Sequence, residues 1–154
     1  RGFKATPWFY PFYFIAFCFE NIFKVLNMEQ LKTMTALFIG GGFGTILRYG
    51  LSKIGNPLSD HFFWGTFGVN IIGCLLLGLI IGLSYKNTAL ASAPLYSFLA
   101  IGLCGGFTTF STFAFENQAF LKNGQILEFT FYTLSSIIIG ILAISLGLHT
   151  AKAI

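Results

Sequence analysis

The sequence predicts an all-α membrane protein that crosses the bilayer four times. Apolar residues make up 55% of the 154-residue chain and charged residues only 9%, against about 25% charged in typical soluble domains. The apolar residues gather in four long runs, each close to the ~20 residues that a helix needs to cross a hydrocarbon core. Such runs favour helices over barrel strands, because a helix satisfies its own backbone hydrogen bonds in lipid.

Short breaks with charged and turn-forming residues separate the four apolar runs. The first break contains Gly55-Asn56-Pro57 and the third contains Lys122-Asn123-Gly124, both typical of loops. Glycines recur four residues apart inside the spans, as at Gly40 and Gly44, and small residues let helix backbones approach closely in lipid. The expected spans are residues 35–51, 62–85, 93–120 and 126–149.

The first 33 residues are expected to form an N-terminal extension, separate from a four-helix domain at residues 34–154. The extension has no small-residue cleavage site and therefore makes a poor signal peptide. Two interpretations of it remain open. Either the segment is not translated and the protein starts at Met28 or Met34, or residues 8–19 form a short anchor at the membrane surface.

Charged residues after residue 27 are few, and the basic ones are expected to be evenly divided between the two sides of the bundle. Six Lys or Arg residues stand against four Asp or Glu residues, which is too little positive charge for a nucleic-acid-binding surface. Basic residues normally set the orientation of a membrane protein, and here the two sides of the expected bundle carry three each. This balance predicts insertion in both orientations. One side carries Lys32, Lys86 and Lys152, and the other carries Arg48, Lys53 and Lys122.

Polar residues in the second and fourth spans form two pairs with helical spacing. Thr66 and Asn70 are four residues apart, as are Tyr132 and Ser136, so each pair shares one helix face. An amide in hydrocarbon costs several kcal/mol unless it is hydrogen-bonded. Asn70 is therefore expected either to tie two helices together or to line a polar path.

The third span contains an unusually polar segment, GLCGGFTTFSTFAFE, at residues 102–116. Its paired glycines, Gly105 and Gly106, disfavour a continuous helix, and the carbonyls freed by a break can bind a small hard cation such as Na⁺. Phe110 and Phe113 lie three residues apart on one face, and phenylalanine ring edges carry partial positive charge. This face suits a compact anion, although a packing seam of phenylalanines explains the same pattern.

Catalytic motifs are missing from the sequence. The chain has no G-x-S-x-G segment and no metal-ligand spacing, and its three cysteines are scattered. His61 falls in an expected loop and His149 at the end of a span, where a residue of the membrane interface is expected rather than a catalytic base. An enzyme is therefore not expected.

Three segments of the chain resemble a known protein family. GGGFGTILRYG, GTFGVNIIG and GGFTTFSTFAFE, in this order and spacing, resemble the CrcB/Fluc family of fluoride channels, and the likeness runs from about residue 34 to the C-terminus. Members of that family are small four-helix proteins that assemble as antiparallel, dual-topology homodimers with two fluoride pores. The resemblance implies a multi-pass protein of the cell membrane that passively exports fluoride and relieves its toxicity.

The resemblance also implies roles for individual residues. A central Na⁺ would be held by the backbone carbonyls of Gly105 and Thr108, together with the same pair from a second copy of the chain. Arg48 corresponds to an arginine of the vestibule, and Glu116 to the acidic residue that follows the third motif. The implied fluoride-pore residues are Asn70, Phe110, Phe113, Thr66, Ser111, Tyr132 and Ser136.

Two other classes of membrane protein share the four-helix pattern. Small multidrug exporters depend on a carboxylate in the first span, and residues 35–51 contain none. A membrane scaffold that transports nothing would use the glycines and phenylalanines only for packing. The implied pore residues instead favour a channel, because neutral amide, hydroxyl and ring-edge donors can replace the water shell of fluoride without trapping the ion.

Overall fold

The computed structural model describes residues 27–56 and 62–154, and the regular elements in these residues are all helical. Interpretations of residues 1–26, and of His61, lie outside the described residues. Residues 33–154 form one compact unit, and the contacts discussed below lie within it. The helices are α2 (Met28–Gly55), α3 (Trp64–Ser84), α4 (Ala93–Tyr96), the π-helical η3 (Ser97–Leu103), α5 (Cys104–Phe107), α6 (Phe110–Lys122) and α7 (Ile126–Ala153).

Within the described residues, three segments are long and apolar enough to cross a membrane: Trp64–Ser84, Ala93–Lys122 and Ile126–Ala153. They correspond to the second, third and fourth predicted spans, so the prediction of a multi-pass helical membrane protein is confirmed. α2 is also long, with 28 residues, but three successive glycines and Arg48 make it less apolar. Its crossing of the membrane stays a prediction.

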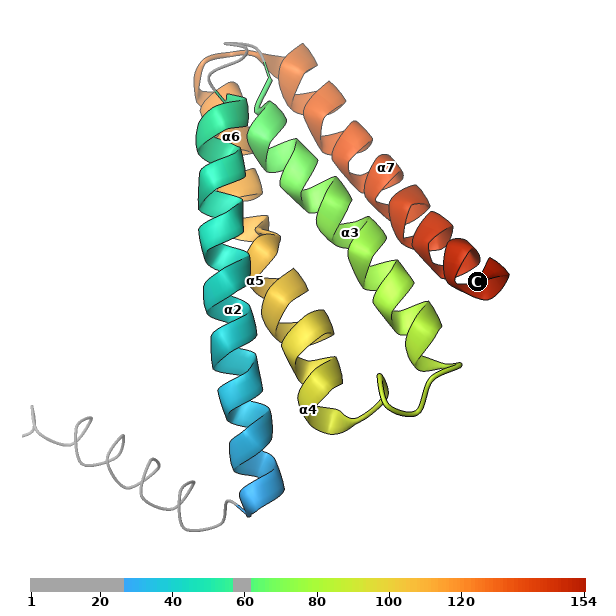
Figure 1. Ribbon diagram of the computed structural model, residues 1–154. Helices are drawn as coiled ribbons and strands as arrows, with labels where there is room; N and C mark the ends of the chain where they lie inside the picture. The colour runs from blue at the N-terminus through green and yellow to red at the C-terminus, as the bar shows by residue number, and fades with distance from the viewer. Residues whose placement is uncertain (1–26, 57–61) are drawn as a thin grey trace, which may run out of the picture. The chain divides into compact units, whose positions relative to one another are not determined.

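The third span is broken near its middle, between α5 and α6 (Figure 1). Thr108 (φ −85°, ψ 160°) and Thr109 (φ −150°, ψ 117°) are extended there. The sequence placed the break at Gly105 and Gly106, and this was wrong by a few residues, because both glycines lie inside the helical turn α5. Gly106 serves close packing instead: a β-carbon there would lie 2.5 Å from the carbonyl oxygen of Gly41 on α2.

Glycines bring the helices close enough for backbone contact, as the sequence predicted. A β-carbon at Gly40 would overlap the carbonyl oxygen of Phe98 in η3, and one at Gly44 would overlap that of Leu103. α3 and α7 pack along their lengths (Figure 1), again through glycines of both helices. This packing sets α3, the broken third span and α7 around the same region of the unit.

Candidate ion-binding site

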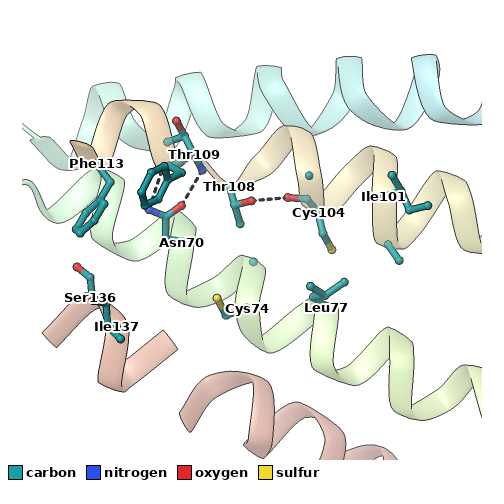
Figure 2. Close-up of a pocket in the computed structure, with 14 residues that line it drawn as sticks. Asn70, Cys74, Leu77, Ile101, Cys104, Thr108, Thr109, Phe113, Ser136 and Ile137 are labelled. Carbon is teal, nitrogen blue, oxygen red and sulfur yellow. Dashed lines mark hydrogen bonds between the residues drawn. The ribbon is translucent and has the colours of Figure 1, made fainter. Parts of the chain in front are cut away.

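A cavity of about 480 Å³ lies beside the break in the third span (Figure 2). Its wall combines residues from α3, from both sides of the break and from α7. Among the described residues, no charged side chain lines this cavity, and Cys74, Leu77, Ile101 and Ile137 make much of its wall apolar. The predicted site residues that lie in the wall are Asn70, Gly105, Thr108, Phe110, Phe113 and Ser136.

Asn70 ties α3 to the break, which is one of the two interpretations left open by the sequence, and it also lies in the cavity wall. That it lines a polar path stays a prediction. Its side-chain Oδ1 accepts the backbone N–H of Thr109 at 2.8 Å. Its Nδ2 donates to the carbonyl oxygen of the same residue at 3.2 Å. The amide of Asn70 therefore bonds both backbone groups of a residue that has left the helix (Figure 2).

Hydroxyl groups organise the start of α6. Thr109 caps this helix, because its Oγ1 accepts the backbone N–H of Thr112 at 3.2 Å and its hydroxyl donates to Thr112 Oγ1 at 2.9 Å. Ser111 is exposed on the first turn, with its Oγ 3.4 Å from Thr109 Oγ1, and it is not part of the cavity wall described above. The positive end of the α6 dipole thus lies at the edge of the cavity.

The two predicted pore phenylalanines form a pair at the cavity. The Phe110 and Phe113 ring centroids are 5.9 Å apart and the planes are inclined by 45°. Phe113 also contacts the ring of Tyr132, with centroids 5.3 Å apart, whereas Phe110 is 79% exposed. The Phe113 ring is thus packed within the protein, and the Phe110 ring projects from its surface.

Asn117, which the sequence did not indicate as a site residue, links the backbone of Phe113 to α7. Its Nδ2 donates to the Phe113 carbonyl oxygen at 2.9 Å, and its Oδ1 accepts the hydroxyl of Thr133 on α7 at 2.8 Å. The side chain is buried. A polar residue in the turn after the phenylalanine pair was the only signal available for it.

Ser136 on α7 has a buried side-chain hydroxyl without a hydrogen-bond partner among the described residues. The residue belongs to the cavity wall. An unpaired buried hydroxyl costs roughly 1–3 kcal/mol. This hydroxyl is therefore available to a polar ligand in the cavity.

Thr66, Glu116 and Tyr132 form a separate buried cluster outside the cavity wall. Thr66 Oγ1 donates to Glu116 Oε1 at 2.6 Å, and the Tyr132 hydroxyl donates to Oε2 at 2.7 Å. Glu116 is only 4% exposed. Its hydrogen-bond partners among the described residues are neutral, so hydroxyl and amide donors from other segments of the fold hold this carboxyl group.

Asn56 joins this cluster although it follows the end of α2 and was read from the sequence only as part of a turn. Its Oδ1 accepts the backbone N–H of Thr66 at 3.1 Å, and its Nδ2 lies 3.5 Å from Glu116 Oε1. α3 has no capping side chain of its own at Phe63. Asn56 therefore performs the capping role from another segment.

Arg48 reaches the helix preceding the break. Its Nε donates to the carbonyl oxygen of Gly106 at 3.1 Å in a partly buried position. Arg48 is not in the cavity wall, and its guanidinium group ties α2 to α5. Its role in a vestibule stays a prediction.

Comparison with known proteins identifies the family of this chain. A family profile described as "CrcB-like protein, Camphor Resistance (CrcB)" matches residues 35–148. The chain is 42% identical over 123 residues, 79% of its length, to the whole of the fluoride-specific ion channel FluC of Phocaeicola vulgatus. The FluC proteins of Chlorobium phaeobacteroides and Bacteroides fragilis are 42% and 44% identical over 81% and 76% of this chain, and 96% and 94% of their own lengths. This chain belongs to the CrcB-like protein family.

Proposed function

We propose that this chain is a fluoride-specific ion channel that lets fluoride leave the cell passively and so relieves fluoride toxicity. Its relatives bear the name of such a channel, and it is accordingly not an enzyme. The observation that carries the proposal is the uncharged cavity beside the helix break. The protein acts as a multi-pass component of the cell membrane.

The cavity wall supplies groups that can replace the water shell of fluoride. Ser136 has a hydroxyl without a partner, Asn70 has a second amide hydrogen beyond the one used at Thr109, and the phenylalanine pair adds ring edges with partial positive charge. None of these donors is a cation. Many modest contacts allow an ion both to enter and to leave, which conduction requires.

Helical spacing extends the proposed path away from the cavity. Thr66 lies one turn before Asn70 on α3, and Tyr132 lies one turn before Ser136 on α7. Both lead to the buried cluster at Glu116. Fluoride would pass from the cavity toward the Thr66 and Tyr132 hydroxyls, each of which would turn its one hydrogen from Glu116 to the passing ion. Ser111 would serve the start of α6, and Arg48 would raise the local anion concentration at the entrance.

A structural Na⁺ ion belongs to the proposal, and the backbone at the break fits it. In a regular helix the N–H groups of Thr109 and Thr112 would bond the carbonyls of Gly105 and Thr108. Here the first N–H donates to Asn70 Oδ1 and the second to Thr109 Oγ1. The carbonyls of Gly105 and Thr108 are thereby available as neutral oxygen ligands, and bound Na⁺ would supply positive charge to hold them in place.

A second copy of the chain completes both ion sites in the proposal. Two carbonyls are too few ligands for Na⁺, and a symmetric homodimer would supply four. Phe110, at 79% exposed, would enter the partner's pore region. The even division of basic residues supports an antiparallel dimer with dual topology, surrounded by membrane lipid.

Fluoride efflux from liposomes tests the proposed function. Purified protein should release trapped fluoride down its gradient, while chloride release stays at the level of protein-free vesicles. Equal passage of both ions would refute the selective lining. Absence of fluoride release from vesicles that contain folded protein would refute the channel itself.

A further inference from the structure

We infer that Asn70 is a positioning residue for the sodium site, acting through the backbone N–H of Thr109. The inference rests on the sodium site proposed above. Asn70 lies on α3, whereas the proposed sodium ligands are backbone carbonyls of the third span. The same residue lines the anion cavity, so it would serve both ions.

Two acceptors compete for the backbone N–H of Thr109: the Gly105 carbonyl and Asn70 Oδ1. An N–H four residues after a carbonyl is the natural partner of that carbonyl in a helix, and Thr109 holds this position relative to Gly105. The structure gives the Thr109 N–H to Asn70 Oδ1 at 2.8 Å instead. Because one N–H forms only one well-aligned hydrogen bond, Asn70 keeps the Gly105 carbonyl available for a cation.

The surroundings support this reading of the geometry. Thr109 is extended rather than helical, and Asn70 Nδ2 also donates to its carbonyl oxygen at 3.2 Å. Gly105 is exposed, and a β-carbon built on it would meet nothing within 4 Å. The backbone at Gly105 thus borders open space that an ion or a partner chain can fill.

The Oδ1 and Nδ2 atoms of Asn70 then have different functions that substitution can separate. Oδ1 withholds the Thr109 N–H from Gly105 and so prepares the cation site. Nδ2 carries the hydrogens that face the carbonyl and the anion cavity. A substitution that keeps the acceptor but removes the donor should spare sodium binding and harm fluoride passage. Loss of the acceptor should harm sodium binding.

Asn70→Asp and Asn70→Leu make this distinction at nearly constant volume. Asn70→Asp keeps an acceptor for the Thr109 N–H, but places negative charge beside the anion path. Asn70→Leu removes both polar groups and lets the N–H return to Gly105. The measurement is the thermal unfolding temperature of the purified protein in detergent, titrated with NaCl against N-methyl-D-glucamine chloride, since a ligand that binds only the folded state raises this temperature.

Asn117→Leu is the matched control. It also removes a buried amide that bonds a backbone carbonyl and a neighbouring group, but its partners are Phe113 and Thr133 rather than Thr109 at the break. It should lower the unfolding temperature and leave the sodium-dependent rise intact. A loss of packing alone is thereby separated from a loss of sodium binding.

We expect the sodium-dependent rise in unfolding temperature to persist in Asn70→Asp and Asn117→Leu. In Asn70→Leu, the sodium concentration that gives half of this rise should increase about tenfold or more, because the Thr109 N–H then bonds the Gly105 carbonyl in both copies of the chain. An unchanged sodium response in Asn70→Leu would overturn the inference. If that variant does not fold, a lost response in folded Asn70→Asp would overturn it and a retained one would support it. Lack of response in the unmodified protein would overturn the sodium site as well, whereas its fluoride efflux reports separately on the channel.

Discussion

Tyr132→Phe removes the hydroxyl that donates to Glu116 Oε2 at 2.7 Å and leaves the aromatic ring in place. Tyr132 is fully buried and Glu116 is 4% exposed, so bulk water cannot replace the lost donor without local opening. A buried acceptor that loses its donor costs ~1–3 kcal/mol. We therefore expect the substitution to lower the free energy of unfolding by about 2 kcal/mol.

A double-mutant cycle measures this bond directly. Tyr132→Phe, Glu116→Leu (which removes the acceptor) and the double variant are compared by equilibrium unfolding in detergent, and the coupling energy should be about 2 kcal/mol. Thr133→Val serves as the control, because it removes a hydroxyl that donates to a neutral amide at 2.8 Å and should cost about 1 kcal/mol. A Tyr132–Glu116 coupling below about 0.5 kcal/mol would refute the reasoning.

The remaining predictions concern the ring pair, the remote cap and the helix contacts. Phe110→Ile and Phe113→Ile should slow fluoride efflux from liposomes sharply while cross-linking still detects dimers; unchanged efflux would contradict a role for the ring edges. Asn56→Ala should cost about 1 kcal/mol of stability, since it uncaps α3; an unchanged free energy of unfolding would count against the cap. Gly44→Ala should cost about 1–3 kcal/mol through overlap with the η3 backbone, which unfolding measurements can contradict by showing no change.

Sequence patterns predicted the features of this fold that depend on local chemistry. Apolar runs located the second, third and fourth spans to within a few residues. The Lys122-Asn123-Gly124 turn is present, and Gly124 has a φ of +72°, which favours glycine. The three-residue spacing of Phe110 and Phe113 correctly placed their rings together.

Contacts between residues far apart in the chain could not be predicted from local sequence patterns. Asn56 looked like a turn residue because its partners, Thr66 and Glu116, are 10 and 60 residues away. Glu116 itself was recognisable only by its place at the end of the third motif, since its donors come from other parts of the fold. The site of the helix break was misplaced for a related reason: Gly106 packs against α2, and the side chains of Asn70 and Thr109 accept the backbone N–H groups of Thr109 and Thr112.

Diffraction from crystals soaked in fluoride, or in bromide as a heavier substitute, tests the central claim most directly. That claim is that an uncharged wall of amide, hydroxyl and ring-edge groups binds the permeating anion. Density for the anion should lie in the cavity, next to the ring edges of Phe110 and Phe113 and within reach of Ser136 Oγ. Anion density only beside basic side chains outside the cavity, with the cavity itself empty, would contradict the claim.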